Sequence, residues 1–178
     1  MAVRALDPRP IAKPVSDLRA MSTPTALFSP VRLDAVRGSG LTTGASLQRL
    51  DRAVRVVVAA CGAPVAVALL IDDRTLHLAT SHGLDEHERA AVTTLSIPLS
   101  RTIVARAVLG DEPVLLSNLR HDARYRADPL ANAGMAAVLA VPLVVRGQAI
   151  GVLAACDRVP HQWDTEQRES LESLALLS

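Results

Sequence analysis

The stretch Met135-Ala-Ala-Val-Leu-Ala-Val-Pro-Leu-Val-Val-Arg-Gly-Gln-Ala-Ile-Gly-Val-Leu-Ala-Ala-Cys-Asp157 holds two apolar runs of strand length on either side of Arg146-Gly147-Gln148. Runs rich in Val, Leu and Ile that flank a glycine-containing turn predict a β-hairpin. Neither run alternates with polar residues, so we expect both faces of the hairpin to be covered, in the middle of a sheet. Because Pro142 cannot donate to a strand ladder, a bulge or a one-sided pairing is expected there.

Working outward from the hairpin, the pattern of apolar residues predicts alternating helices and strands. Before it, we expect a helix over 47–61, strands over 64–71 and 75–81, short helices over 85–92 and 100–110, and a strand over 113–116. After it, a helix is expected from Asp164 to the end of the printed sequence. This order indicates an antiparallel sheet with helices packed on its faces, which is an α+β domain.

The predicted helix starts carry capping residues. Asp85 is followed three residues later by Glu88, as in a capping box, and Asp164 is followed in the same way by Gln167. Ser100 is expected to cap the helix over 100–110, and Asp128 precedes a proline suited to a first helical turn. Side-chain capping therefore supports these helix boundaries.

Residues 1–43 differ in character from the rest of the chain. They combine several prolines with Ser, Thr, Arg and Asp and show no sustained hydrophobic period. Such composition predicts a disordered or loosely attached tail. The folded domain is expected over 45–178.

Composition limits the class of protein. The 178 residues are 49% hydrophobic but only 2% aromatic, so the core must consist mainly of Ala, Val, Leu and Ile. A net charge of +1 argues against a non-specific nucleic-acid binder. Cys61 and Cys156 have no metal-site spacing, and no secretion signal or membrane-length apolar run is found. We expect a soluble, cytoplasmic protein without a membrane or nucleic-acid partner.

Several short motifs, in order and spacing, resemble the GAF domain family over about residues 45–178. They are Gly62-Ala-Pro64, Ser81-His-Gly83-Leu84, Gly110-Asp-Glu-Pro113, Asp122-Ala-Arg124-Tyr125, Val141-Pro142-Leu143, Gly147-Gln-Ala-Ile-Gly151-Val-Leu, Cys156-Asp157-Arg158 with Trp163, and Leu171-Glu-Ser-Leu174-Ala175. The resemblance implies an antiparallel sheet of five or six strands, with the N- and C-terminal helices on one face and a loop-covered pocket on the other. It further implies a sensory or regulatory signalling module, in which Pro142 occupies a usual position.

Specialised uses of the family require residues that are mostly missing here. Sulfoxide reduction needs a nucleophilic and a resolving thiol near the pocket, but residues 118–135 contain no cysteine. Bilin attachment also needs a pocket cysteine, and the cyclic-nucleotide signature needs a lysine, whereas Lys13 is the sole lysine. We therefore expect no catalysis and no required cofactor. A haem sensor using His77 or His121, or a thiol redox sensor, remains the alternative.

The segment 117–126, here called the polar arc, is the least apolar part of the predicted domain. Its arginines could bind a carboxylate or phosphate in a bidentate manner. The competing interpretation is a solvated loop in which Asp122 and Arg124 pair with each other. The candidate ligand-binding residues are Ser100, Arg101, Ser117, Asn118, Arg120, His121, Asp122, Arg124 and Tyr125.

The two terminal helices each carry an apolar stripe, over 47–61 and 171–177, whose ordinary use is packing on the sheet. In the family that the chain resembles, such helices also pair between protomers and pass on signals. The resemblance thus implies a homodimer, with an effector protein acted on in trans. Ligand binding would shift the relative position of the helices. A dimerisation module without a ligand is the third alternative.

Overall fold

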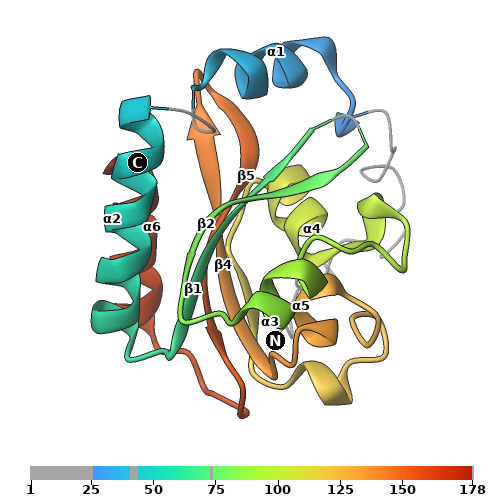
Figure 1. The fold of residues 1–178 in the computed structure, drawn as a ribbon, viewed down its shortest axis with the longest axis vertical. Helices are drawn as coiled ribbons and strands as arrows, with labels where there is room; N and C mark the ends of the chain where they lie inside the picture. The colour runs from blue at the N-terminus through green and yellow to red at the C-terminus, as the bar shows by residue number, and fades with distance from the viewer. Residues whose placement is uncertain (1–25, 41–43, 73, 178) are drawn as a thin grey trace, which may run out of the picture.

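The computed structural model describes residues 26–40, 44–72 and 74–177. They form an antiparallel sheet whose five strands lie in the order β2-β1-β5-β4-β3 (Figure 1). The strands are β1 (Val65–Ile71), β2 (Leu76–His82), β3 (Val114–Leu116), β4 (Ala137–Val145) and β5 (Gln148–Asp157). The predicted hairpin is β4–β5, with β5 at the centre of the sheet, so its interior position is confirmed.

The hairpin shows how its sequence sets its geometry. Arg146 and Gly147 have φ angles of 51° and 73°, which matches the positive φ that a tight hairpin turn requires. Pro142 stays in register opposite Val152, and the register shifts between Leu143 and Val144. The irregularity expected at the proline is thus present one residue later.

Glycine is required at one point in the central strand pair. A Cβ atom added at Gly151 would lie 2.1 Å from the Leu69 carbonyl oxygen of β1. Any side chain at position 151 would therefore push β1 and β5 apart.

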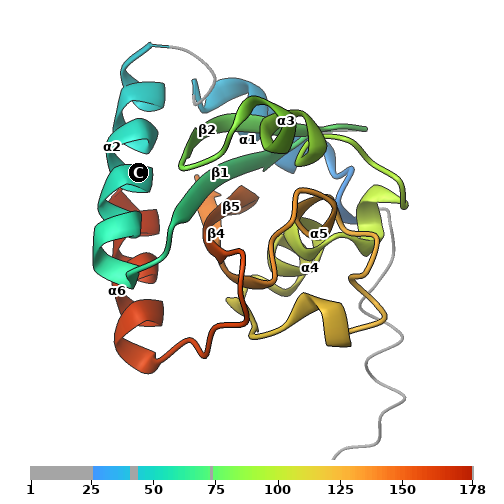
Figure 2. The ribbon, with the colours of Figure 1, turned by 60° about the horizontal axis from the view of Figure 1, so that its bottom comes forward.

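Two helices cover one face of the sheet, α2 (Gly44–Cys61) and α6 (Thr165–Leu177). Figure 2 shows them side by side, apart from the helices of the opposite face. Small side chains of the sheet, among them Ala66, Ala68 and Ala155, lie in this core with Leu50 and Leu171. The pairing of the terminal helices on one face confirms the α+β architecture inferred from sequence.

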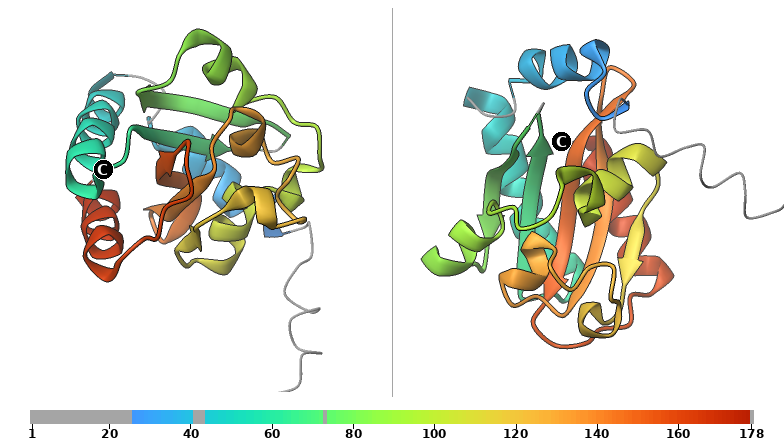
Figure 3. Two further views of the ribbon diagram at one scale, coloured as in Figure 1. Left: turned by 90° about the horizontal axis from the view of Figure 1, so that it is seen from below. Right: turned by 90° about the vertical axis from the view of Figure 1, so that its right-hand side faces the viewer.

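Short elements cover the other face (Figure 3). They are α3 (Glu86–Ala91), η3 (Leu99–Arg101), α4 (Ile103–Gly110), η4 (Leu119–His121) and α5 (Pro129–Asn132). A second apolar core, with Ile103, Leu130 and Met135 among its members, lies beneath them. This is the face on which the resemblance placed a loop-covered pocket.

The caps agree with the sequence at every predicted helix except one. The capping box of Asp85 and Glu88 is present, and Asp164 and Gln167 exchange the equivalent bonds. Ser100, however, does not cap α4, because it lies inside the preceding 3₁₀ turn. Thr102 takes the extended conformation of an N-cap, and its hydroxyl accepts the Ala105 N–H at 3.1 Å.

The prediction of a disordered or loosely attached tail is wrong for residues 26–40. They include the helix α1 (Pro30–Gly38), which lies across the end of the sheet that carries the hairpin turn (Figure 1). The Arg32 guanidinium is buried and donates to the carbonyl oxygens of Leu27, Ile71 and Asp72. Two of these acceptors lie about forty positions away in the chain, so local composition gave no sign of them. The remainder of the predicted tail, 1–25 and 41–43, lies outside the described residues.

Candidate functional site

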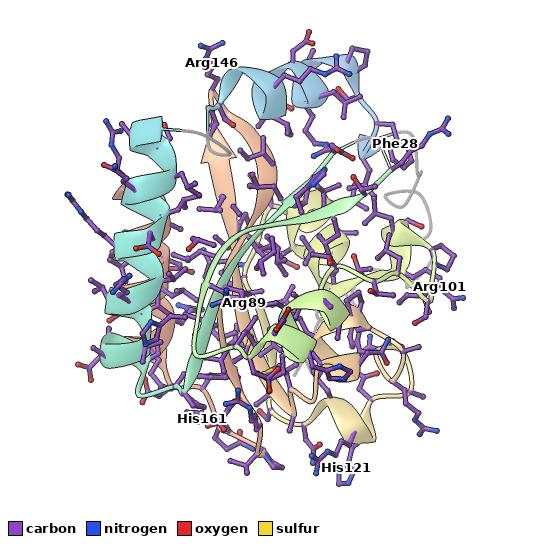
Figure 4. The ribbon with its side chains drawn as sticks, in the orientation of Figure 1. Phe28, Arg89, Arg101, His121, Arg146 and His161 are labelled. Atoms are coloured by element: carbon purple, nitrogen blue, oxygen red, sulfur yellow. The ribbon has the colours of Figure 1, made fainter. Side chains whose placement is uncertain are left out.

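The polar arc connects β3 to α5 at the end of the sheet opposite α1. In Figure 4, His121 of the arc lies far from Arg146 of the hairpin turn, which marks the α1 end. Leu119 anchors the arc, because its side chain is fully buried and its N–H donates to the Ala136 carbonyl at 2.7 Å. The arc is therefore fixed to the start of β4 and is part of the folded domain.

Tyr125 is the buried aromatic residue of the arc, and two arginines flank its ring. The guanidinium carbons of Arg106 and Arg124 lie 5.9 Å and 5.3 Å from the ring centroid. The Arg106 side chain also donates to the Tyr125 hydroxyl at 2.7 Å. Cation–π attraction and this hydrogen bond hold the arc against α4.

Asp122 and Arg124 form a closed pair. Arg124 donates to the two carboxylate oxygens of Asp122 at 3.0 Å and 2.7 Å, and its backbone N–H donates to the same carboxylate. The hydrogen bonds from Arg124 hold the pKa of Asp122 below its usual range. For these two residues the competing interpretation from sequence is therefore confirmed: Asp122 and Arg124 pair with each other and fix the shape of the loop.

The first residues of the arc stabilise its own turn. The Asn118 side chain accepts the Arg120 N–H at 3.1 Å and so caps η4, and its amide contacts the His121 ring at 3.4 Å. The Ser117 hydroxyl donates to the Gln162 side chain at 3.2 Å. These groups give the arc a defined shape.

Ser100 and Arg101 lie apart from the other candidates. Both belong to η3, and Figure 4 shows Arg101 well separated from His121. The structure therefore brings seven of the nine predicted residues together along the arc and leaves these two on another segment.

A cavity of about 360 Å³ opens beside the arc, and its lining combines two arginines with uncharged residues. Its lining residues are Leu119, Arg120, Arg126, Ala131, Gly134 and Met135. Only Arg120 belongs to the nine candidates named from sequence. Leu119 and Arg126 also belong to the arc, whereas the other lining residues follow it. The signal that could have revealed these later residues is the Asp128-Pro129 cap at the start of α5.

Asp128 fixes the position of this wall. Its buried carboxylate accepts the Ile103 N–H at 2.8 Å and the Leu130 N–H at 2.9 Å, so one side chain holds the first turns of both α4 and α5. Burial raises the pKa of Asp128, although these two hydrogen bonds oppose the shift. Sequence predicted the α5 cap but not the bond to α4.

The thiols offer little for redox chemistry. Cys61 and Cys156 belong to the two different cores and thus lie on opposite faces of the sheet. Burial, with a smaller contribution from Asp164, raises the pKa of Cys61 to about 11, and burial also raises the pKa of Cys156. Both thiols therefore stay protonated near neutral pH, which weighs against a thiol sensor.

The histidines suggested for haem do not line the cavity. His77 is exposed on β2 and contacts Asp72 and Thr75, and His121 is exposed on the arc. In the described part of the chain, no three His, Cys, Asp or Glu side chains are placed to hold a metal ion. The haem alternative thus gains no support from these side chains.

A polar node joins the arc to the terminal helices, and His161 is at its centre. The His161 N–H donates to the Ser117 carbonyl at 3.0 Å, and the Trp163 indole N–H donates to the Leu116 carbonyl at 3.3 Å. The His161 ring lies 3.2 Å from an oxygen of Asp157. The loop after β5 is thereby attached to the beginning of the arc.

The same node reaches α6 and α2 through Gln167. The Gln167 side-chain amide lies 3.1 Å from His161 Nε2 and donates to the Cys61 carbonyl at 2.7 Å, at the last residue of α2. Its amide oxygen also accepts the Asp164 N–H at 2.9 Å. We define these three residues, His161, Trp163 and Gln167, as the relay node. Sequence had identified Gln167 only as a cap and Trp163 only as part of a motif.

The chain is thus a compact α+β domain, in which an antiparallel sheet carries the paired terminal helices on one face and short helices, loops and the cavity on the other. The GAF domain model matches residues 47–177, and the chain belongs to this family. Such domains are commonly sensory or regulatory modules. None of the described helices combines the length and apolar character needed to cross a membrane.

Solved structures of similar fold come from several kinds of protein. The GAF domain of an Acinetobacter phosphoenolpyruvate-protein phosphotransferase is 25% identical, with a TM-score of 0.61 over 84% of this chain and 91% of that chain. A domain described as part of a two-component sensor histidine kinase from Sinorhizobium meliloti is 21% identical, with a TM-score of 0.59 and coverage of 76% and 89%. Free methionine-R-sulfoxide reductase from Neisseria meningitidis is 22% identical, with a TM-score of 0.57 and coverage of 74% of each chain. Among curated proteins, none matches significantly.

Proposed function

We propose that this GAF domain is a non-catalytic sensory or regulatory module. In this proposal, a small ligand binds in the cavity beside the polar arc, and occupancy is passed to α2 and α6. The observation that carries the proposal is the relay node, in which one histidine contacts the Ser117 carbonyl of the arc and the Gln167 side chain of α6. The beginning of the polar arc and the terminal helices thus share a hydrogen-bonded connection.

The relay requires that the ligand favour one arrangement of the node over another. Leu119 and Arg120 line the cavity and lie two and three residues after Ser117, so a ligand that shifts η4 would displace the Ser117 carbonyl. His161 would then move relative to Gln167, whose amide also binds the last carbonyl of α2. The expected output is a change in how α2 and α6 lie relative to each other.

The surroundings of the thiols support the absence of catalysis. The sulfoxide reductase of similar fold is an enzyme, but here the two buried cysteines lie on opposite faces of the sheet. Neither can reach the other as a resolving thiol. Two free cysteines also fit a reducing compartment, and we place the protein in the cytoplasm.

The outer faces of the terminal helices support a homodimer. On α2, exposed Arg49 and Arg52 share a stripe with Val56, which is 48% exposed. On α6, exposed Glu166 and Glu169 share a stripe with Leu176, which is 84% exposed. The two stripes are complementary in charge, so α2 of one protomer fits α6 of a second copy. An effector protein in trans would bind to the same two helices, α2 and α6.

Native mass spectrometry of protein purified at low ionic strength tests the ligand proposal. We expect a retained small molecule whose mass is lost in Ala131→Phe, which fills the cavity, and kept in Ala59→Phe, an exposed position on α2. Two protomers with nothing bound would instead indicate the ligand-free dimerisation module.

A further inference from the structure

We infer that the ligand of the arc cavity is a small anion, with a carboxylate or phosphate group held by Arg120 and Arg126 and a compact apolar body. This inference rests on the proposed function, because it names the chemical class of ligand for the same cavity.

The arginines around the arc fall into two groups. Arg124 is neutralised by Asp122, and Arg106 donates to the Tyr125 hydroxyl. Arg120 and Arg126 line the cavity, and within the described residues neither takes part in an ion pair. The cavity wall therefore carries two positive charges that the neighbouring side chains leave uncompensated.

The nearby carboxylates cannot supply that compensation. Both oxygens of Asp122 bind Arg124, and both oxygens of Asp128 accept backbone N–H groups while the side chain is buried. Guanidinium groups bind carboxylate and phosphate through paired, charge-assisted hydrogen bonds. An anion from solution is thus the chemical partner that the wall lacks.

The rest of the cavity determines the size and polarity of the ligand body. Apart from the two arginines, its lining residues are Leu119, Ala131, Gly134 and Met135, none of which carries a charge, and Ala131 and Gly134 are small. A volume of about 360 Å³ is near the lower end of ordinary ligand sites. These features favour a small organic acid or phosphate ester over a bare inorganic ion.

Titration calorimetry of the full chain with three probes tests this class. The probes are hexanoate, its uncharged amide hexanamide, and inorganic phosphate, and thermal unfolding checks that each variant is folded. We expect hexanoate to bind at least ~10-fold more tightly than hexanamide, and to weaken by a similar factor in the double variant Arg120→Gln/Arg126→Gln. The matched control Arg89→Gln removes an exposed arginine from α3 and should leave the affinity unchanged. Weaker binding of hexanoate at high salt would further support the inference.

The outcomes separate this inference from the proposed function. Equal binding of hexanoate and hexanamide, unaffected by the arginine variants, would overturn the anionic class and leave a cavity that binds small molecules. Binding of phosphate with the same affinity as hexanoate would support the anionic group and overturn the apolar body. Absence of binding by all three probes would overturn the inference, while a molecule retained in native mass spectrometry would still uphold the proposed function.

Discussion

The rings of His161 and Trp163 stack with their centroids 4.1 Å apart and their planes 23° from parallel, in the loop between β5 and α6. This stack holds together two contacts that point in different directions. Trp163 reaches the Leu116 carbonyl at the end of β3, and His161 reaches Gln167 in the first turn of α6. A loop that joins two elements in sequence thus also joins the polar arc to the terminal helices.

Gln167→Ala should weaken the attachment of α6 to α2. The change removes the hydrogen bond to the Cys61 carbonyl and the hydrogen bond that the Gln167 side chain accepts from the Asp164 N–H at the start of α6. We expect a loss of about 1–2 kcal/mol in the free energy of unfolding, measured by urea denaturation. Gln48→Ala, at an exposed position of α2, should change it by less than ~0.5 kcal/mol. Equal effects of the two substitutions would argue against a structural role for the node.

Arg32→Met should destabilise the attachment of α1. The substitution leaves buried carbonyl oxygens, including that of Ile71, without their donor. We expect a cost of about 2–4 kcal/mol in the free energy of unfolding and faster amide exchange along α1. Arg37→Met serves as the control, because its side chain is 73% exposed on the same helix. An Arg32→Met protein as stable as the Arg37→Met protein would show that the hydrogen bonds of Arg32 contribute little to stability.

The ion pair of Glu88 with Arg158 should make stability depend on pH. Arg158 donates to both carboxylate oxygens of Glu88, at 2.8 Å and 2.7 Å, and these bonds hold the pKa of Glu88 below its usual value. A carboxyl group with a lowered folded pKa stabilises the fold above its unfolded pKa of about 4.3, and this contribution is lost as pH falls through the folded pKa.

The difference in unfolding free energy between the wild type and Arg158→Gln should therefore be largest near about pH 7 and shrink below about pH 4. Urea denaturation at several pH values measures it, with Arg89→Gln on α3 as the control. A difference that stays constant with pH would show that Arg158 acts mainly through its bond to the Gly83 carbonyl.

Both cysteines should react slowly with a thiol reagent in the folded protein. With the pKa of Cys61 raised to about 11, only ~0.1% of this thiol is ionised at about pH 8. We expect labelling with a disulfide reagent to be at least ~100-fold slower than in urea. Fast labelling of either cysteine in the folded state would revive the thiol-sensor alternative.

The proposed dimer should respond to charge reversal on its two helices. Arg49→Glu/Arg52→Glu places negative charges on α2 opposite the negative stripe of α6, so sedimentation should show a shift toward monomer. Adding Glu166→Arg/Glu169→Arg to the same chain should restore the dimer, because the stripes become complementary again. A dimer unaffected by the first pair of substitutions would place the interface elsewhere.

Much of the fold could be predicted because its signals are local. The β4–β5 hairpin follows from two apolar runs and a turn, and the capping pairs Asp85–Glu88 and Asp164–Gln167 follow from residues three positions apart. Helix α1 could not be predicted, because the burial of Arg32 depends on carbonyls at Ile71 and Asp72 that only the folded chain brings near it.

Of the candidate site, too, the local contacts could be predicted from sequence and the long-range contacts could not. The local pair Asp122–Arg124 was foreseen as an alternative, and it is formed. The cavity was not foreseen in full, because α5 and the residues after it form its other walls. The relay node makes hydrogen bonds to residues 47 and 106 positions away, beyond the reach of any local pattern.

Trp163 is the only tryptophan, and it therefore reports on the relay node alone. The most direct measurement is the ¹⁹F resonance of 5-fluorotryptophan at this position while hexanoate is titrated into the arc cavity. Our account predicts that the resonance shifts in step with calorimetric binding, and that both the shift and the binding are lost in Arg120→Gln/Arg126→Gln. Saturation of the cavity with no change in the Trp163 resonance would contradict the proposed connection between the arc and the terminal helices.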